Sequence, residues 1–200
     1  MEALQFIKAV APHFSIFFGG VSIVNILAVD QARHGAWAVF DYDKKSLVDY
    51  GTWAFESKSH TFEQAILHIE ALINEVIHTH SIDAVFFEDI QLRKNVQSFK
   101  KLAQLQGVLV NLCEKNEYLY GLVAPTQWQN YCKARGRTTK EIKSKVTEVE
   151  LTEKKSSKIL SLQFVQEKYG IDTDNDNLSD AICIGHYVVN NLEISKGEKT

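Results

Sequence analysis

The sequence has few cysteines and few prolines. Its three cysteines, Cys113, Cys132 and Cys183, are widely spaced and form no Cys-x-x-Cys pair. An odd, scattered set predicts neither a disulfide framework nor a zinc site, and it fits the reducing cytoplasm. The two prolines, Pro12 and Pro125, leave no proline-rich linker that would divide the chain. With 200 residues, we expect one domain, residues 1–200.

Positive charge and long apolar runs are also scarce. The net charge is −3 and the isoelectric point is about 6.2, so any binding of nucleic acid must depend on local clusters. The apolar stretch from Phe14 to Val29 is interrupted by Asn25 and is shorter than the roughly 20 residues of a membrane span. No basic cluster precedes it, which argues against a signal peptide. We expect no membrane association, and the pattern predicts no role for residues 1–20.

Five short apolar runs predict strands, and four segments with helical periodicity predict helices. The strands are expected at 23–30, 36–42, 47–55, 82–87 and 118–124, and the helices at 61–80, 95–113, 159–169 and 178–192. Short connections make the first three strands an antiparallel meander, and crossovers add two strands parallel to the first. The fold class is therefore α/β, a five-stranded mixed sheet flanked by helices, with its core at about 22–192.

Three acids stand at the ends of these elements. Asp30 ends the first strand, Glu88 ends the fourth, and Asp180 lies in the first turn of the last helix. Neighbouring strands would place the first two side by side, and the helix can deliver the third. Clustered carboxylates repel one another unless a cation joins them, which indicates a Mg²⁺ or Mn²⁺ site. Two such ions, about 3.5–4 Å apart, support phosphodiester hydrolysis. Each acid taken alone also fits a turn or a helix cap.

Two basic clusters stand out in this acidic chain. One lies between Lys133 and Lys145, and the other follows Glu88 directly. Both are typical of contacts with DNA phosphates, although a solvated helix face remains the alternative. The residues expected to bind DNA are Arg93, Lys94, Lys100, Lys101, Lys133, Arg135, Arg137 and Lys140. No site is assigned to any of the seven histidines.

Three motifs in order resemble those of the RuvC-type Holliday junction resolvases, above all the phage-encoded members. The first is Ile-Leu-Ala-Val-Asp30, followed by a polar turn and a second strand. The second is Glu88 followed by Lys94-Asn95, a serine and a helix containing Gly107. The third is Leu178-Ser-Asp180-Ala-Ile. Each motif alone is weak, but together they cover roughly residues 23–190 and match the strand and helix order of the RNase H-like fold.

The resemblance implies a metal-dependent endonuclease that resolves four-way and other branched DNA in the cytoplasm of a bacterial or phage-infected cell. It implies two Mg²⁺ or Mn²⁺ ions, with Asp30 bridging both, Glu88 holding one and Asp180 completing the pair. No small-molecule cofactor is implied. Two symmetric cuts require two active sites related by a two-fold axis, hence a homodimer. The apolar faces of the helices at 61–80 and 95–113 are candidates for its interface.

The chain departs from the family at two positions. Asn177 stands where the family has a fourth ligand, Asp or His, and it supplies only a neutral oxygen, so Asp176 beside it is the alternative ligand. We favour Asn177 slightly, because Asp176 is expected to precede the helix proper. Gln91 stands where cellular members carry an aromatic residue that helps to part the bases, and glutamine cannot stack in this way. Their sequence preference is therefore not expected here.

Two other functions stay open at this point. Another nuclease of the RNase H-like fold would act on hybrids instead of junctions. A catalytically weak or dead protein that only binds branched DNA is suggested by Asn177. Metal-dependent cleavage of junctions would separate these alternatives from the leading hypothesis.

Overall fold

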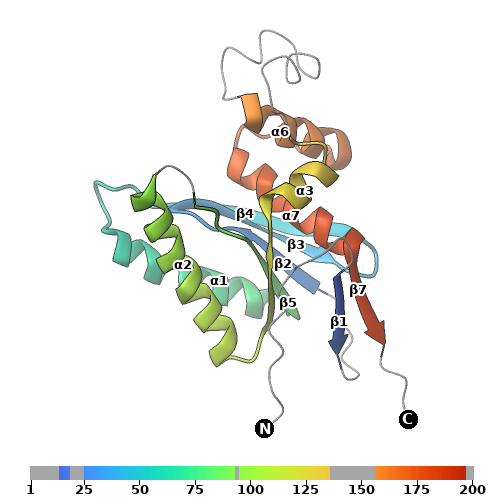
Figure 1. Ribbon diagram of the computed structural model, residues 1–200, viewed down its shortest axis with the longest axis horizontal. Helices are drawn as coiled ribbons and strands as arrows, with labels where there is room; N and C mark the ends of the chain where they lie inside the picture. The colour runs from blue at the N-terminus through green and yellow to red at the C-terminus, as the bar shows by residue number, and fades with distance from the viewer. Residues whose placement is uncertain (1–13, 19–24, 93–94, 136–155, 197–200) are drawn as a thin grey trace.

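A central five-stranded sheet organises the computed structural model, which describes residues 14–18, 25–92, 95–135 and 156–196 (Figure 1). Its strand order is β4-β3-β2-β5-β6. The strands are β2 (Asn25–Asp30), β3 (His34–Asp41), β4 (Ser46–Ala54), β5 (Ala84–Glu88) and β6 (Leu119–Val123). β2, β3 and β4 are antiparallel neighbours, and β5 and β6 run parallel to β2. The expected mixed sheet is confirmed.

Two long helices, α1 (Phe62–Thr79) and α2 (Val96–Lys115), cover one face of the sheet (Figure 1). Thr61 begins α1 with a capping box, because its hydroxyl accepts from the backbone of Gln64 while the Gln64 side chain accepts from Thr61 N. Asn95 caps α2 with its side-chain oxygen, which accepts from the backbone N of Gln97 and of Ser98. Apolar residues at helical spacing, such as Ile69, Ile73 and Leu109, are fully buried against the sheet.

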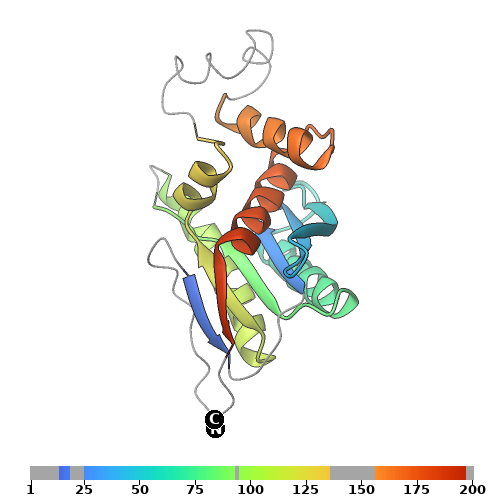
Figure 2. The same cartoon turned by 90° about the vertical axis from the view of Figure 1, so that its right-hand side faces the viewer.

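The opposite face is covered by α7 (Asp176–Asn191), and α3 (Pro125–Tyr131) and α6 (Ser156–Tyr169) pack against α7 (Figure 2). α7 packs closely on β2 and β3 at Gly185, where an added Cβ would stand 2.3 Å from the ring of Phe40 and 3.2 Å from Cβ of Ala28. The missing side chain at Gly185 thus lets the helix backbone approach the sheet.

Two expectations about this face were wrong in detail. α3 was not predicted, because Pro125 reads as the end of a strand, whereas proline is well suited to the first position of a helix, which it occupies here. α7 begins at Asp176 and not at residue 178, because Asn175 acts as its N-cap and accepts from Leu178 N at 3.1 Å. Asp180 therefore lies one turn inside the helix instead of in its first turn.

A second, two-stranded sheet was not predicted. β1 (Phe14–Phe18) pairs in parallel with β7 (Leu192–Lys196), in a register that joins Phe14 to Leu192 and Phe18 to Lys196. The strands lie side by side in both views (Figures 1 and 2). Residues 14–18 thus form an edge-to-edge pair with the segment that directly follows the last helix, which ends at Asn191. Within the described ranges, no helix has both the length and the apolar character needed to cross a membrane.

Candidate active site at the carboxyl ends of β2 and β5

Asp30 and Glu88 end neighbouring parallel strands. The strand register pairs Val29 with Phe87, so the two acids that follow emerge next to each other. Both line one cleft of about 340 Å³ beyond the strand ends, together with Gln31, Gln91, Asn95, Ser98, Phe99 and Pro125. The structure thus brings together two of the three carboxylates that the sequence singled out.

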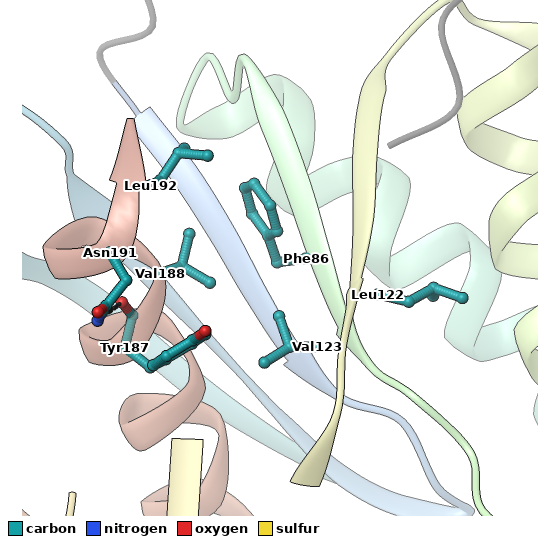
Figure 3. Close-up of a pocket in the computed structure, with 7 residues that line it drawn as sticks. All are labelled: Phe86, Leu122, Val123, Tyr187, Val188, Asn191 and Leu192. Carbon is teal, nitrogen blue, oxygen red and sulfur yellow. Dashed lines mark hydrogen bonds between the residues drawn. The ribbon is translucent and has the colours of Figure 1, made fainter. Parts of the chain in front are cut away.

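Both side chains point toward the α7 face of the sheet. Ala28 meets α7 at Gly185, and Phe86 lines a small apolar cavity with Tyr187 and Val188 (Figure 3). Side chains two positions apart on a strand share a face, so Asp30 follows Ala28 and Glu88 follows Phe86. The cavity of Figure 3 is separate from the cleft, and none of the residues that line it is acidic or basic.

α7 carries Asp180 to the same end of the sheet. The helix runs antiparallel to β2, because its last turns lie near the start of that strand, where Tyr42 Oη donates to Leu192 O at 2.7 Å. Asp180 precedes Gly185 by about 7.5 Å along the helix axis, at 1.5 Å per residue. Asp30 lies about 6.6 Å beyond Ala28 in the same direction. Asp180 and Asp30 are therefore at similar heights along the sheet.

Asp180 also lies on the side of α7 that faces β5. It shares a helical stripe with Ile184, Tyr187 and Asn191, and the last two line the cavity beside Phe86 and Val123 (Figure 3). Asp180 is nevertheless absent from the lining of the cleft. In the part of the chain that the structure describes, no three His, Cys, Asp or Glu side chains form a group ready to hold a metal ion.

The two candidates for a fourth ligand both lie in the first turn of α7. Asp176 is the first residue of the helix and Asn177 the second, so the expectation that Asp176 precedes the helix was wrong. Both side chains are half-buried, and the carbonyl of Asp176 accepts from Ser179 Oγ at 2.9 Å. Positions three and four residues before Asp180 are both its neighbours on a helix surface. The helix geometry that favoured Asn177 therefore no longer separates the two.

Glu88 is held by residues that no pattern in the sequence selects. Trp128 Nε1 donates to Glu88 Oε1 at 2.9 Å, and the side-chain amides of Gln31 and Gln106 both donate to the backbone oxygen of Glu88. These residues lie far apart in the chain, and no local pattern links them to the acid. Gln31 is buried, and its Oε1 has no hydrogen-bond partner among the described residues. The oxygen-rich donor set of the cleft fits a hard divalent cation.

Four of the eight expected DNA-binding residues lie in the described part of the chain. Lys100 and Lys101 are exposed on α2, and Lys101 Nζ lies 5.5 Å from the ring centroid of Phe62. Lys133 is exposed just after α3, whereas Arg135 is half-buried with Nη1 3.4 Å from Asn130 Oδ1. The remaining four, Arg93, Lys94, Arg137 and Lys140, lie outside the described residues.

Histidine and cysteine side chains are poorly placed to act in the cleft. His186 is buried on α7 with Nδ1 2.7 Å from Tyr169 Oη, and burial lowers its pKa to about 4. It is therefore neutral near pH 7. All three cysteines are buried, and burial raises the pKa of the Cys113 thiol to about 12. A thiolate nucleophile is thus unsupported.

Comparison with known proteins agrees with this geometry. The family described as crossover junction endodeoxyribonuclease RuvC matches residues 26–186, a span that includes Asp30, Glu88, Asp176, Asn177 and Asp180. A RuvC protein of that description from Sulfurovum sp. (strain NBC37-1) is 28% identical over 158 residues, which cover 72% of this chain and 98% of the relative. Another, from Wolinella succinogenes, is 36% identical over 90 residues, which cover 43% of this chain and 54% of the relative.

Solved structures show the same fold. T. thermophilus RuvC in complex with a Holliday junction substrate superposes with a TM-score of 0.60 at 12% identity, covering 82% of this chain and 91% of the other. The yeast mitochondrial Holliday junction resolvase Ydc2 gives a TM-score of 0.50 at 11% identity, covering 82% and 77%. The narrower likeness to phage-encoded members stays a prediction. By the extent of the family match, the chain belongs to the RuvC family of crossover junction endodeoxyribonucleases.

Proposed function

We propose that this endonuclease resolves four-way and other branched DNA by metal-assisted hydrolysis at the cleft between β2 and β5. In this proposal Asp30, Glu88 and Asp180 hold two divalent ions, Mg²⁺ or Mn²⁺, with Asn177 or Asp176 as a further ligand. The observation that carries the proposal is the meeting of Asp30 and Glu88 in one cleft, both pointing toward the face covered by the helix of Asp180.

The chemistry follows from charge. A bound divalent ion supplies a more acidic water and stabilises the oxygen that leaves when the phosphodiester breaks. Asp30 and Glu88 supply anionic oxygens to bind it, and their repulsion without it provides a strong electrostatic reason for binding. Exposed Lys100 and Lys101, on the helix that follows Glu88, contact the phosphates and orient the strand. Lys133 and Arg135, together with Arg93, Lys94, Arg137 and Lys140, extend this contact.

The substrate and the assembly follow from the need for two cuts. T. thermophilus RuvC, which has this fold, is known in complex with a Holliday junction substrate. Two symmetric cuts across such a junction require a homodimer with two clefts on one side. The apolar faces of α1 and α2, expected as candidates for its interface, are buried against the sheet, which leaves their outer faces, where Leu67 on α1 is 64% exposed. We place this activity in the cytoplasm, with residues of about 22–192 forming one nuclease domain.

A second candidate is a protein that binds junctions without cutting them. It is favoured by the neutral Asn177 and by the position of Asp180 outside the lining of the cleft. A third, another RNase H-like nuclease, would prefer RNA–DNA hybrids.

One assay tests all three. Synthetic four-way junctions, flaps, linear duplexes and hybrids are incubated with the protein, with Mg²⁺, Mn²⁺ or a chelator. We expect paired nicks in the junction that require metal. Binding without cleavage at any metal concentration would favour the second candidate, and preferential cutting of the hybrid would favour the third.

A further inference from the structure

We propose that Trp128, on α3, is a positioning residue for Glu88. This inference rests on the proposed function, because it assumes that Glu88 is a metal ligand. The starting observation is the hydrogen bond from Trp128 Nε1 to Glu88 Oε1, 2.9 Å long. Trp128 is 2% exposed, so its ring is fixed by packing and cannot easily turn away.

The backbone around Glu88 is already fixed by other contacts. β5 pairs with β2 on one side and β6 on the other, and Asp89 N donates to Val123 O at 2.8 Å just past Glu88. Buried Gln31 and Gln106 donate to the carbonyl of Glu88 itself. The side-chain torsions are then the main remaining freedom of Glu88. The hydrogen bond from Trp128 restricts them and sets the orientation of the carboxylate plane.

An indole is suited to this role because it is neutral. A lysine or arginine at the same place would form an ion pair and compete with the metal ion for the carboxylate. Indole Nε1–H is only a donor, so it holds an oxygen without offering an acceptor of its own. A hydrogen bond to a carboxylate is also stronger than one between neutral groups. Partners of this kind orient metal ligands in many proteins.

The same short helix also contacts α7. Cys132, which follows the last residue of α3, has its thiol 3.6 Å from the carbonyl of Cys183, and Cys183 lies three residues after Asp180. At its other end, α3 starts at Pro125, which lines the cleft, and Gln127 caps this start by accepting from Ala124 N at 3.0 Å. One helix therefore touches the strand that carries one acid and the helix that carries another.

The test is the binding of Mn²⁺ to the full-length protein without DNA, measured by calorimetry and by electron paramagnetic resonance. Trp128→Phe keeps a buried aromatic ring but removes the donor. We expect its Mn²⁺ affinity to fall by about tenfold, the lower range for losing a partner that orients a ligand. The Mn²⁺ concentration for half-maximal junction cleavage should rise by the same factor, with the rate at saturating Mn²⁺ nearly unchanged.

Tyr120→Phe is the matched control. Tyr120 Oη donates to Glu114 Oε1 at 2.8 Å, so this variant also removes an aromatic donor from a glutamate, but away from the cleft. Its Mn²⁺ affinity should equal that of the wild type. If Trp128→Phe does not fold, as judged by circular dichroism, benzothienylalanine incorporated at position 128 keeps the ring shape and lacks the N–H.

A double-mutant cycle gives the decisive outcome. In a Glu88→Ala background, Trp128→Phe should cause no further loss of Mn²⁺ affinity, because the side chain that it positions has gone. Wild-type affinity in Trp128→Phe, or an equal loss in both backgrounds, would overturn the role of Trp128. If Glu88→Ala itself left Mn²⁺ binding unchanged, the proposed metal site would fail instead, so the two failures are distinguishable.

Discussion

The two faces of the sheet are covered in different ways. On one face, α1 and α2 are long amphipathic helices that bury an apolar cluster that includes Ile73 and Leu109. On the other, α3, α6 and α7 come from the last part of the chain, and this is the face toward which Asp30 and Glu88 point. Both faces bury apolar clusters, but the two acids point toward only one of them, and this difference can be tested.

The largest effect is expected on the α7 face from Asp30→Asn. It removes an anion that the proposed metal ions share, so junction cleavage should fall by roughly 10³-fold or more, as for other groups that act as one unit. Junction binding should stay the same or tighten, because less negative charge faces the phosphates. Glu88→Gln and Asp180→Asn should behave alike, and double variants should be no worse than single ones. Single-turnover cleavage and gel-shift assays measure both properties.

Asp49→Asn serves as the control for charge, since Asp49 lies on β4 beside His80, 3.2 Å from its Nε2, and away from the cleft. Cleavage by Asp30→Asn at more than a small residual rate would contradict the assignment of Asp30.

On the opposite face, Ile73→Ala should reduce stability without altering the chemistry. Ile73 is fully buried between α1 and the sheet, so the cavity should lower the free energy of unfolding by about 2–5 kcal/mol. The cleavage rate per folded molecule should match that of the wild type. Urea denaturation and active-site titration test this pair of outcomes, and a large loss of rate in the folded variant would show that the two faces are not separable.

Acid sensitivity should reside on the α7 face, at His186. Its folded pKa of about 4 is below the value near 6.5 of an exposed histidine, so the unfolded chain binds the proton more readily. The destabilising effect of this proton uptake is absent above about pH 6.5, and the free energy of unfolding falls as the pH drops from there toward 4. Between pH 7 and pH 5 the loss should be about 2 kcal/mol. His186→Phe should be less pH-dependent than the wild type in thermal melts, whereas equal pH dependence would reject this role.

Neutralising Lys133, Arg135 and Arg137 together should weaken binding of every DNA sequence by about tenfold or more and flatten its dependence on salt, because phosphate contacts release counterions. Binding measured from 50 to 300 mM salt gives the slope. An unchanged slope would favour the alternative, in which this cluster is a solvated surface that does not contact DNA.

The smallest effect concerns the start of α7. If Asn177 is a metal ligand, Asn177→Ala should raise the metal concentration for half-maximal cleavage a few-fold, and Asn177→Asp should not. If Asp176 is the ligand, Asp176→Asn should cause the larger change. Metal titrations on one junction substrate compare the three variants, and no change in any of them would remove the fourth ligand from the site.

What could be predicted from the sequence depends on how local the signal is. The sheet order and α1 follow from local signals. Each buried strand, each short turn and the cap at Thr61 is formed by residues that lie close together in the chain. Asp30 and Glu88 were predicted as a pair because strand order alone makes them neighbours. The Trp128–Glu88 hydrogen bond has no such signal, because it joins side chains 40 positions apart through a seven-residue helix that begins with proline.

The start of α7 shows a different limit. Residues 174–177 read Asp-Asn-Asp-Asn, and each is a suitable N-cap, so the pattern alone does not fix where the helix begins. A shift of two residues moved Asp176 into the helix and Asp180 into its second turn. Site predictions that depend on a helix register inherit this uncertainty about its first residue.

The pairing of β1 with β7 has a consequence for the order of events during synthesis. Phe14 leaves the ribosome early, but its partner Leu192 is made only after every strand of the main sheet. The main sheet and its helices can begin to form while β1 still has no strand to pair with. Contacts between distant parts of a chain form slowly, because a long loop must close first. Among the described strands, β1 is therefore completed among the last, when residues 192–196 have emerged.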